Sequence, residues 1–437
     1  MFKLTLERRD GSPLTLRYDP HKSLLTDQAG HRVDLSPVGF GHLDTTVPGD
    51  VVKVSEDNPT PKSHHITRLK IQLGLACNYA CSYCSQATDR QADRPDLRED
   101  DVGVFLARLP EWFHPVPGAD LKIEFWGGEP LVYWKTLKPL VEGLRARYPA
   151  VVFWMTTNGS LLDDDKIQWL HDIGFSINLS HDGPGQPLRG PDPFDDPLKL
   201  AALRRLYATF APLGRMSFHC VLSLPHHSLL AVRSHIAGKL GVPVERVPIS
   251  TEGLLVVHDG AGLMVSPRSE EDQRRIRHDL FEEIARADMI TTNAGAYRLI
   301  GFFKRLGEGV GMAGQYQRCG MDRPDQIAVN LDGDVLVCQN TTATTHKIGS
   351  VYDFDTIRLT HSTHWGHRPE CNACPMLELC GGSCMFLRGT QRQASCDNEF
   401  TLALPYFRLA LYLLTNALLT RIEGERIRFP GVTSFEF

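Results

Sequence analysis

Apolar and polar positions follow two different periods along this chain. Between residues 66 and about 290, short apolar runs typical of strands are separated by longer segments in which apolar residues recur every three to four positions. The strands are expected at 67–75, 121–126, 151–156, 175–180, 216–222 and 244–249. The helices are expected at 99–109, 134–147, 163–173, 197–210, 228–239 and 270–287. Six βα units predict an α/β fold whose parallel sheet is open or curled into a partial barrel, with functional residues at the C-terminal ends of the strands.

The two ends of the chain follow other patterns. Residues 2–8 and 14–18 alternate apolar and polar positions around the turn signal Asp10-Gly11, so residues 1–65 are expected to form a small β-rich region. Residues 291–318 read as a helical linker, because 294–306 has helical periodicity. Residues 319–400 hold few periodic segments, and residues 401–437 are expected to form a C-terminal helix, starting at 400 and reaching 421, and a tail.

Composition and charge exclude several classes of protein. The 437 residues are 42% hydrophobic and 23% charged, which is ordinary for a globular protein, and the net charge of −5 argues against nucleic-acid binding. The N-terminus lacks the apolar segment of a secretory signal. Pro405, Arg408 and Asn416 interrupt the apolar stretch 401–420, so a packed helix is expected there rather than a membrane span. We therefore expect a cytoplasmic protein.

Eleven cysteines change this picture. In a reducing compartment, clustered cysteines indicate metal binding rather than disulfides. Cys77, Cys81 and Cys84 stand at CxxxCxxC spacing directly after the first expected strand. A structural zinc site needs a fourth ligand, whereas a cubane iron–sulfur cluster held by three thiolates keeps one iron open for chemistry. Cys220 lies alone in an expected strand and is interpreted as an inert buried thiol.

Polar motifs end the next three strands. Gly127-Gly128-Glu129-Pro130 ends the second, where two glycines let backbone approach a ligand and Glu129 supplies an acceptor for an ammonium group. Thr156-Thr157-Asn158-Gly159 ends the third strand, and Ser180-His181-Asp182-Gly183-Pro184 ends the fourth. Asn158 and Asp182 are equally well explained as ligand contacts or as turn residues with local backbone bonds.

In their order and spacing these motifs resemble the radical S-adenosylmethionine (SAM) enzymes. The resemblance implies that Cys77, Cys81 and Cys84 bind three irons of a [4Fe–4S] cluster and that SAM chelates the fourth. It also implies reductive cleavage of SAM to a 5′-deoxyadenosyl radical. The SAM contacts that it implies are Gly127, Gly128, Glu129, Pro130, Asn158, Ser180, Arg189 and Leu222.

The later cysteines resemble the SPASM extension of the same enzymes, which holds two auxiliary [4Fe–4S] clusters. By position, the outer cluster is expected to use Cys371, Cys374, Cys380 and Cys396, and the inner one Cys319, Cys338 and Cys384. The inner set is one ligand short, so its fourth iron is either open to substrate or takes another ligand. His361, His364 and His367 lie near in sequence, but we interpret them as exposed loop histidines. A pair of zinc ribbons is the alternative for the seven thiols, and the full family spacing disfavours it.

The resemblance implies an enzyme that abstracts hydrogen from a peptide and leaves a crosslink or an oxidised residue. Its substrate is expected to be a ribosomally made precursor, and its electron donor a flavodoxin or ferredoxin. Gln339 follows Cys338 where sulfatase-maturing relatives carry an aspartate base, and an amide cannot take a proton. The alternatives are a small-molecule dehydrogenase or mutase and a non-catalytic metal scaffold; no catalytic side chain is assigned. The 1–65 region is a candidate for holding a leader peptide by strand addition.

Overall fold

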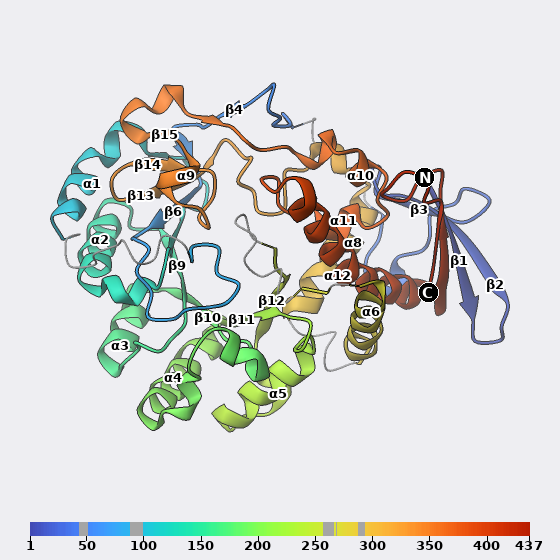
Figure 1. Cartoon of the computed structure of the whole chain (residues 1–437), viewed down its shortest axis with the longest axis horizontal. Helices are drawn as coiled ribbons and strands as arrows, with labels where there is room; N and C mark the ends of the chain where they lie inside the picture. The colour runs from blue at the N-terminus through green and yellow to red at the C-terminus, as the bar shows by residue number, and fades with distance from the viewer. Residues whose placement is uncertain (43–50, 88–98, 257–265, 268, 287–292) are drawn as a thin grey trace.

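The computed structural model describes residues 1–42, 51–87, 99–256, 266–267, 269–286 and 293–437. Its largest sheet has nine strands in the order β12-β11-β10-β9-β8-β6-β13-β14-β15 and is strongly curved (Figure 1). The strands are β6 (Arg68–Gln72), β8 (Lys122–Trp126), β9 (Val152–Thr157), β10 (Ser176–Ser180), β11 (Met216–Leu222), β12 (Ile249–Leu254), β13 (Gln326–Asn330), β14 (Asp334–Leu336) and β15 (Lys347–Ser350). The seven strands from β12 to β13 in this order are mutually parallel, and β14 and β15 continue the sheet antiparallel. The expected α/β fold is confirmed.

Helices cover the outer side of this sheet (Figure 1). They are α1 (Glu99–Trp112), α2 (Trp134–Arg147), α3 (Asp164–Ile173), α4 (Pro197–Phe210) and α5 (Leu229–Leu240). Alternate strand residues such as Ile71, Phe125 and Phe153 are buried in one core with apolar residues of these helices. Because strand side chains alternate, the intervening residues face the other side of the sheet, called here the inner face. Lys70, Glu124 and Trp154 lie side by side on it in register.

The N- and C-terminal segments share a second sheet, in the order β18-β17-β1-β2-β3. Its strands are β1 (Phe2–Arg8), β2 (Pro13–Asp19), β3 (Leu24–Thr26), β17 (Ala417–Glu423) and β18 (Ser434–Glu436). The two N-terminal strands expected from alternation are confirmed. Strand β1 is paired on both sides, and β3 and β18 are the end strands of this sheet. The outer edge of β3 is partly occupied, because Arg32 bridges to Thr26 and Val33 N donates to Leu25 O at 3.0 Å. Two short pairs join distant segments: β4 (Thr60–Pro61) with β16 (Arg358–Leu359), and β5 (His65–Ile66) with β7 (His114–Pro115).

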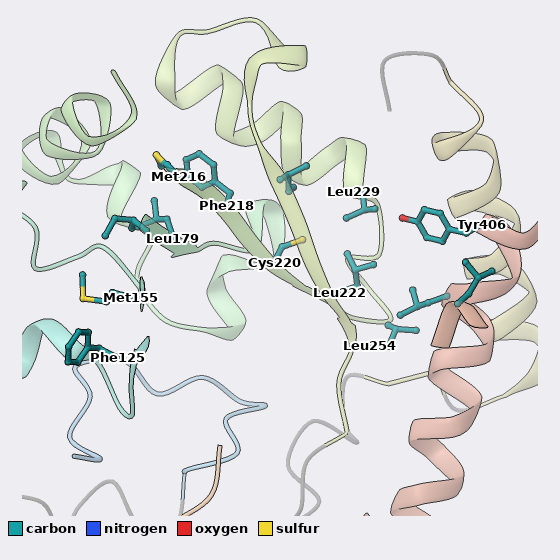
Figure 2. Packing of buried hydrophobic residues seen from close by; sticks show 14 of the residues in the cluster. Phe125, Met155, Leu179, Met216, Phe218, Cys220, Leu222, Leu229, Leu254 and Tyr406 are labelled. Atoms are coloured by element: carbon teal, nitrogen blue, oxygen red, sulfur yellow. The ribbon is translucent and has the colours of Figure 1, made fainter. Parts of the chain in front are cut away.

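The cysteine-rich region packs around a long helix. Helix α12 (Gly389–Thr415) contacts α6 (Glu270–Ile284), α8 (Asn293–Glu308) and β12. Figure 2 shows Tyr406 of α12 facing Leu222 and Leu254 of the large sheet. Shorter helices α9 (Ala343–His346), α10 (Pro369–Asn372) and α11 (Leu377–Cys380) lie in the same region. None of the described helices is long and apolar enough to cross a membrane.

Two expected elements are wrong. The sixth strand was expected at 244–249, but Val244–Arg246 forms a 3-10 turn after Pro243 and β12 starts at Ile249. The helix expected from 400 to 421 begins earlier, at Gly389, and ends at Thr415, where Asn416 takes a left-handed conformation and starts the turn into β17. The expected end of helix 270–287 and the boundary between residues 290 and 291 lie outside the described residues.

Candidate active site

The turn that ends β8 is pressed against the loop that follows β6. A Cβ atom on Gly128 would lie 2.0 Å from the carbonyl oxygen of Ala76, and one on Gly127 would lie 2.3 Å from that of Gly74. The backbone N–H of Glu129 donates to Ala76 O at 3.0 Å. The two glycines are therefore required for this close approach, which places Glu129 next to the loop carrying Cys77.

The Glu129 carboxylate is buried, and both of its oxygens accept hydrogen bonds. It accepts hydrogen bonds from Leu131 N (3.1 Å), Thr157 Oγ1 (2.6 Å) and Asn158 N (2.8 Å). Burial raises its pKa, and the hydrogen bonds from Asn158, Thr157 and Leu131 oppose that rise. Pro130 begins the short 3-10 helix that Glu129 caps. Glu129 thus binds the end of β9 to the end of β8.

Cys77, Cys81 and Cys84 lie close enough for their charges to interact. Burial is the main cause that raises the pKa of Cys77 to about 11, and the charges of Cys81 and Cys84 contribute. Backbone N–H groups of Tyr79 and Gln86 donate to Cys77 Sγ and Cys84 Sγ, each at 3.4 Å. Buried thiols with raised pKa ionise when a metal cation compensates the charge, and N–H donors stabilise the sulfurs of such a site. The chemistry of these donors therefore fits an iron–sulfur cluster.

The loop after β10 closes over the cysteine loop. Tyr83 donates its hydroxyl to Asp182, which also accepts from Val221 N at 2.8 Å. Arg189 Nε pairs with Asp182 Oδ2 at 3.0 Å, and its guanidinium lies over the Tyr83 ring. Ser180 ends β10 and Leu222 ends β11, both buried at the same edge of the sheet. The structure thus brings the expected SAM contacts to one edge, with Arg189 already paired internally.

Four of the later cysteines face one cavity. Cys371, Cys374, Cys380 and Cys396 all line it, together with Arg368. Burial is the main cause that raises the pKa of Cys371 and of Cys380 to about 12, and the charge of Cys396 adds to both. Four convergent thiols in a partly enclosed cavity fit a metal cluster with a full set of protein ligands.

The other three thiols form a separate group near the inner face of the sheet. Burial raises the pKa of Cys338 to about 12, and the charges of Cys384 and Cys319 contribute. Burial also raises the pKa of Cys319. The Lys70 ammonium opposes the rise in pKa at both Cys319 and Cys338, so this inner-face lysine lies close to the group. The seven thiols thus lie in one group of four and one group of three.

Part of the chain matches a known protein family. The sequence profile of the radical SAM superfamily matches residues 71–203, which include the cysteine loop and the ends of β8, β9 and β10. Over these residues the chain matches the radical SAM superfamily. It is therefore an enzyme of the class that uses SAM with a [4Fe–4S] cluster.

The relatives of this radical SAM enzyme differ in how much they share with it. The serine-type anaerobic sulfatase-maturating enzyme of Klebsiella pneumoniae is 23% identical over 366 residues, which is 76% of this chain and 84% of that protein. Molybdenum cofactor biosynthesis protein 1 of Dictyostelium discoideum is 35% identical over 123 residues, but this covers only 28% of this chain and 18% of that protein. The solved structure of native anSMEcpe with bound AdoMet superposes with a TM-score of 0.55 at 19% identity, over 80% of this chain and 98% of that one. The chain is related to the sulfatase-maturating enzymes over most of its length.

One sequence expectation of this radical SAM enzyme needs correction. His364 is not an exposed loop histidine: it is fully buried, and burial lowers its pKa to about 4. Its Nδ1 accepts from Gly366 N at 2.9 Å, and its Nε2 donates to Gln315 O at 3.1 Å. Both ring nitrogens are therefore used within the protein, and neither is available as a ligand. His361 and His367 are exposed, as expected.

Several residues at the site were missed from the sequence. Asn158 Nδ2 donates to Asn78 Oδ1 at 2.9 Å, and Asn78 Nδ2 donates to Ser160 Oγ at 2.7 Å, which ties the end of β9 to the cysteine loop. Lys70 and Glu124 form an ion pair of 3.4 Å on the inner face, largely buried. A charged residue between apolar neighbours in each of two buried strands is the signal that points to this pair.

His181, Asp192 and His235 have the spacing of a metal site, with ligand atoms within 4.8 Å of one another. His181 Nδ1 accepts from Gly183 N at 2.9 Å, so its proton is on Nε2, which donates to Asp192 at 3.1 Å. His235 Nε2 lies 3.1 Å from the other carboxylate oxygen. An Nε2 that carries a proton cannot bind a metal. We interpret the trio as a hydrogen-bonded brace that holds the loop after β10.

Proposed function

We propose that this protein is a peptide-modifying radical SAM enzyme with three [4Fe–4S] clusters. Cys77, Cys81 and Cys84 would hold the SAM-binding cluster, and Gly127, Gly128, Glu129, Pro130, Asn158, Ser180, Arg189 and Leu222 would surround SAM. Cys371, Cys374, Cys380 and Cys396 would hold the outer auxiliary cluster, and Cys319, Cys338 and Cys384 the inner one. When bound, SAM and its cluster supply a 5′-deoxyadenosyl radical, which removes hydrogen from the substrate.

The observation that carries this proposal is the division of seven later thiols into two groups beside the radical SAM core. A structure related in fold, native anSMEcpe with bound AdoMet and Cp18Cys peptide, superposes with a TM-score of 0.53. This supports a peptide as the substrate class, and a ribosomally made precursor is our proposal for its source. The expected product is a crosslink or an oxidised residue, and the expected electron donor is a flavodoxin or ferredoxin.

Gln339 separates this enzyme from its sulfatase-maturating relatives. Its side-chain oxygen is buried and has no hydrogen-bond partner. Its backbone carbonyl accepts from Gln72 Nε2 (3.4 Å) and Gln86 Nε2 (3.2 Å), which fixes the segment between Cys338 and the cysteine loop. Since an amide cannot serve as a base, we propose a peptide modification other than sulfatase maturation.

Anaerobic reconstitution tests the proposal. With dithionite, the enzyme should cleave SAM to 5′-deoxyadenosine, and Cys81→Ala should abolish this activity. Cys220→Ala is the matched control, because Cys220 is buried in β11 away from the other cysteines in sequence. Zinc in place of iron, or wild-type protein that cannot cleave SAM, would contradict the proposal. Stimulation of SAM cleavage by small metabolites but by no peptide would favour the dehydrogenase or mutase alternative.

A further inference from the structure

A large cavity opens at the end of the sheet opposite the SAM site. Its volume is about 650 Å³, and its lining includes Thr67 and Arg68 at the start of β6 and Asp120 and Lys122 at the start of β8. The cysteine loop follows the other end of β6. The cavity is also lined by Cys319, an exposed member of the inner thiol group. We call it the basic cavity.

Cationic side chains dominate its wall in a protein whose net charge is −5. The lining holds two acidic residues, Asp120 and Glu378, against six basic ones: Arg68, Lys122, Arg298, Arg305, Arg318 and Arg323. Three of the six are compensated, because Arg305 pairs with Glu378, Arg318 with Glu399 and Arg323 with Asp325.

The remaining three cations have no carboxylate partner among the described residues. Arg298 Nη1 is buried without any hydrogen bond. Its guanidinium lies 5.5 Å from the centre of the Tyr406 ring. A buried guanidinium nitrogen without a partner is costly unless a ligand supplies an acceptor.

Arg68 and Lys122 form a like-charge pair within the sheet. They are direct register partners on β6 and β8, and Gln326 of β13 continues the same row. Like charges directly opposite each other destabilise a sheet. Two residues further along the same strands, Lys70 and Glu124 form an ion pair instead. The repulsion at the cavity is therefore a local feature, which an anion would relieve.

We propose that the basic cavity binds a carboxylate-bearing segment of the peptide substrate. This inference rests on the proposed function and adds a substrate class to it. The unpaired cations come from β6, β8 and α8, so they are spread around the wall rather than focused on one point. That spread suits an extended chain with several carboxylates better than a single phosphate, and a concave cavity suits a chain segment better than the face of a folded redox protein.

The position of the cavity sets the spacing of the acidic segment from the reacting residue. Arg68 and Gln72 mark the two ends of β6, which span about 13 Å. An extended peptide covers about 3.3–3.6 Å per residue. We therefore expect acidic residues at least about four positions from the modified residue.

Fluorescence anisotropy with the reconstituted full-length enzyme tests this inference. The probes are two labelled hexapeptides, one of alternating Glu and Gly and one of alternating Gln and Gly. The Glu peptide should bind at least about tenfold more tightly than the Gln peptide, and added salt should weaken the binding of the Glu peptide. The double variant Arg68→Gln/Lys122→Gln should remove that preference, and so should Arg298→Gln, which changes a different element. Arg8→Gln/Arg17→Gln, an equal charge change on the exposed N-terminal sheet, should leave it intact.

Cleavage of SAM in the absence of peptide is measured on every preparation. The cavity variants should retain it, which shows that they fold and that the radical SAM site is intact. Equal binding of the two peptides, or an unchanged preference in both cavity variants, would overturn the inference. The inference would also be overturned if inorganic phosphate displaced the Glu peptide more strongly than chloride does at equal ionic strength. Binding of an acidic flavodoxin without binding of the Glu peptide would overturn it as well. If the wild type fails to cleave SAM, the proposed function fails, whatever the peptides do.

Discussion

At the scale of single residues, Glu129 links two strand ends with one carboxylate. Its three donors come from Leu131, Thr157 and Asn158, so both its oxygens are used. An amide in its place offers one acceptor oxygen and brings two N–H donors that would face other donors. The carboxylate therefore shapes the site in addition to any contact with SAM.

Glu129→Gln should consequently lower SAM affinity roughly tenfold to a hundredfold, since hydrogen bonds to a charged group contribute about 1.5–3 kcal/mol. Equilibrium dialysis with labelled SAM measures the affinity, and urea unfolding should show a loss of about 2 kcal/mol. Glu7→Gln, at an exposed position of β1, should change neither quantity. Unaltered SAM affinity in Glu129→Gln would remove this residue from the site.

The His181 brace predicts a dependence of stability on pH. Burial lowers the pKa of His181, against the effect of the hydrogen bond that its Nε2 donates to Asp192. Burial alone would raise the pKa of Asp192, but hydrogen bonds with His181 and His235 hold it well below its usual range. Because the folded-state pKa of His181 lies below the unfolded value of about 6.5, the unfolded chain takes up the proton first as pH falls.

The free energy of unfolding should therefore decrease below about pH 6.5, with a contribution from His181 of up to about 1.4 kcal/mol per pH unit. His181→Asn keeps an acceptor for Gly183 N and should flatten this slope. Urea unfolding at about pH 7.5 and about pH 5.5 measures it. If His181→Asn kept the same slope as the wild type, His181 could not be the source of the slope. His31→Asn, at an exposed site, is the control and should keep the wild-type slope.

At the scale of elements, the start of β8 shows a conflict between stability and the inferred ligand site. Lys122 faces Arg68 in register, so Lys122→Glu would replace a repulsive pair with an attractive one. This should raise the free energy of unfolding by about 0.5 kcal/mol and the midpoint of thermal unfolding with it. The same variant should lose its preference for the Glu peptide. Lys3→Glu, which places an acid beside Glu423 on β17, should instead be destabilising. A less stable Lys122→Glu would show that the pair is not repulsive in the folded protein.

Most elements of the large sheet could be predicted from the sequence, because buried parallel strands leave continuous apolar runs. Strand β12 was misplaced, since its residues Ser250, Thr251 and Gly253 carry little apolar signal. The start of α12 was missed because its first turns, near Gln391, are polar. Pairing between β1 and β17 joins residues more than 400 positions apart, and local patterns carry no information on such contacts.

The candidate site, like the fold, has parts that could be predicted from the sequence and parts that could not. Strand-end motifs and cysteine spacing are local, so the candidate residues could be predicted from the sequence. The Asn78–Asn158 bond, the burial of His364 and the basic cavity depend on which loops meet in space. Among these, only the alternating charged residues at 68, 70, 122 and 124 left a trace in the sequence.

At the scale of the whole molecule, the outer thiol group joins the two sheets. Helix α12 carries Cys396 near its start and leads directly into β17, which pairs with β1 (Figure 1). After β17 the chain returns: Arg428 N donates to Ala373 O at 2.7 Å, and Arg428 Nη2 donates to Cys396 Sγ at 3.3 Å. The C-terminal segment is therefore anchored on the loop that holds Cys371 and Cys374.

A metal held by this group should thus stabilise the terminal sheet as well as its own region. Cys374 is buried in the main core cluster, and its loss as a ligand should release one of the three proposed clusters, roughly a third of the iron. Amide hydrogen exchange in β17 and β1 of Cys374→Ser should rise, because the Arg428 anchor loses its fixed partners. Cys220→Ser makes the same chemical change at a buried thiol of β11 and should keep both the iron and the protection. Equal iron loss in both variants would show that general destabilisation, rather than a missing ligand, is the cause.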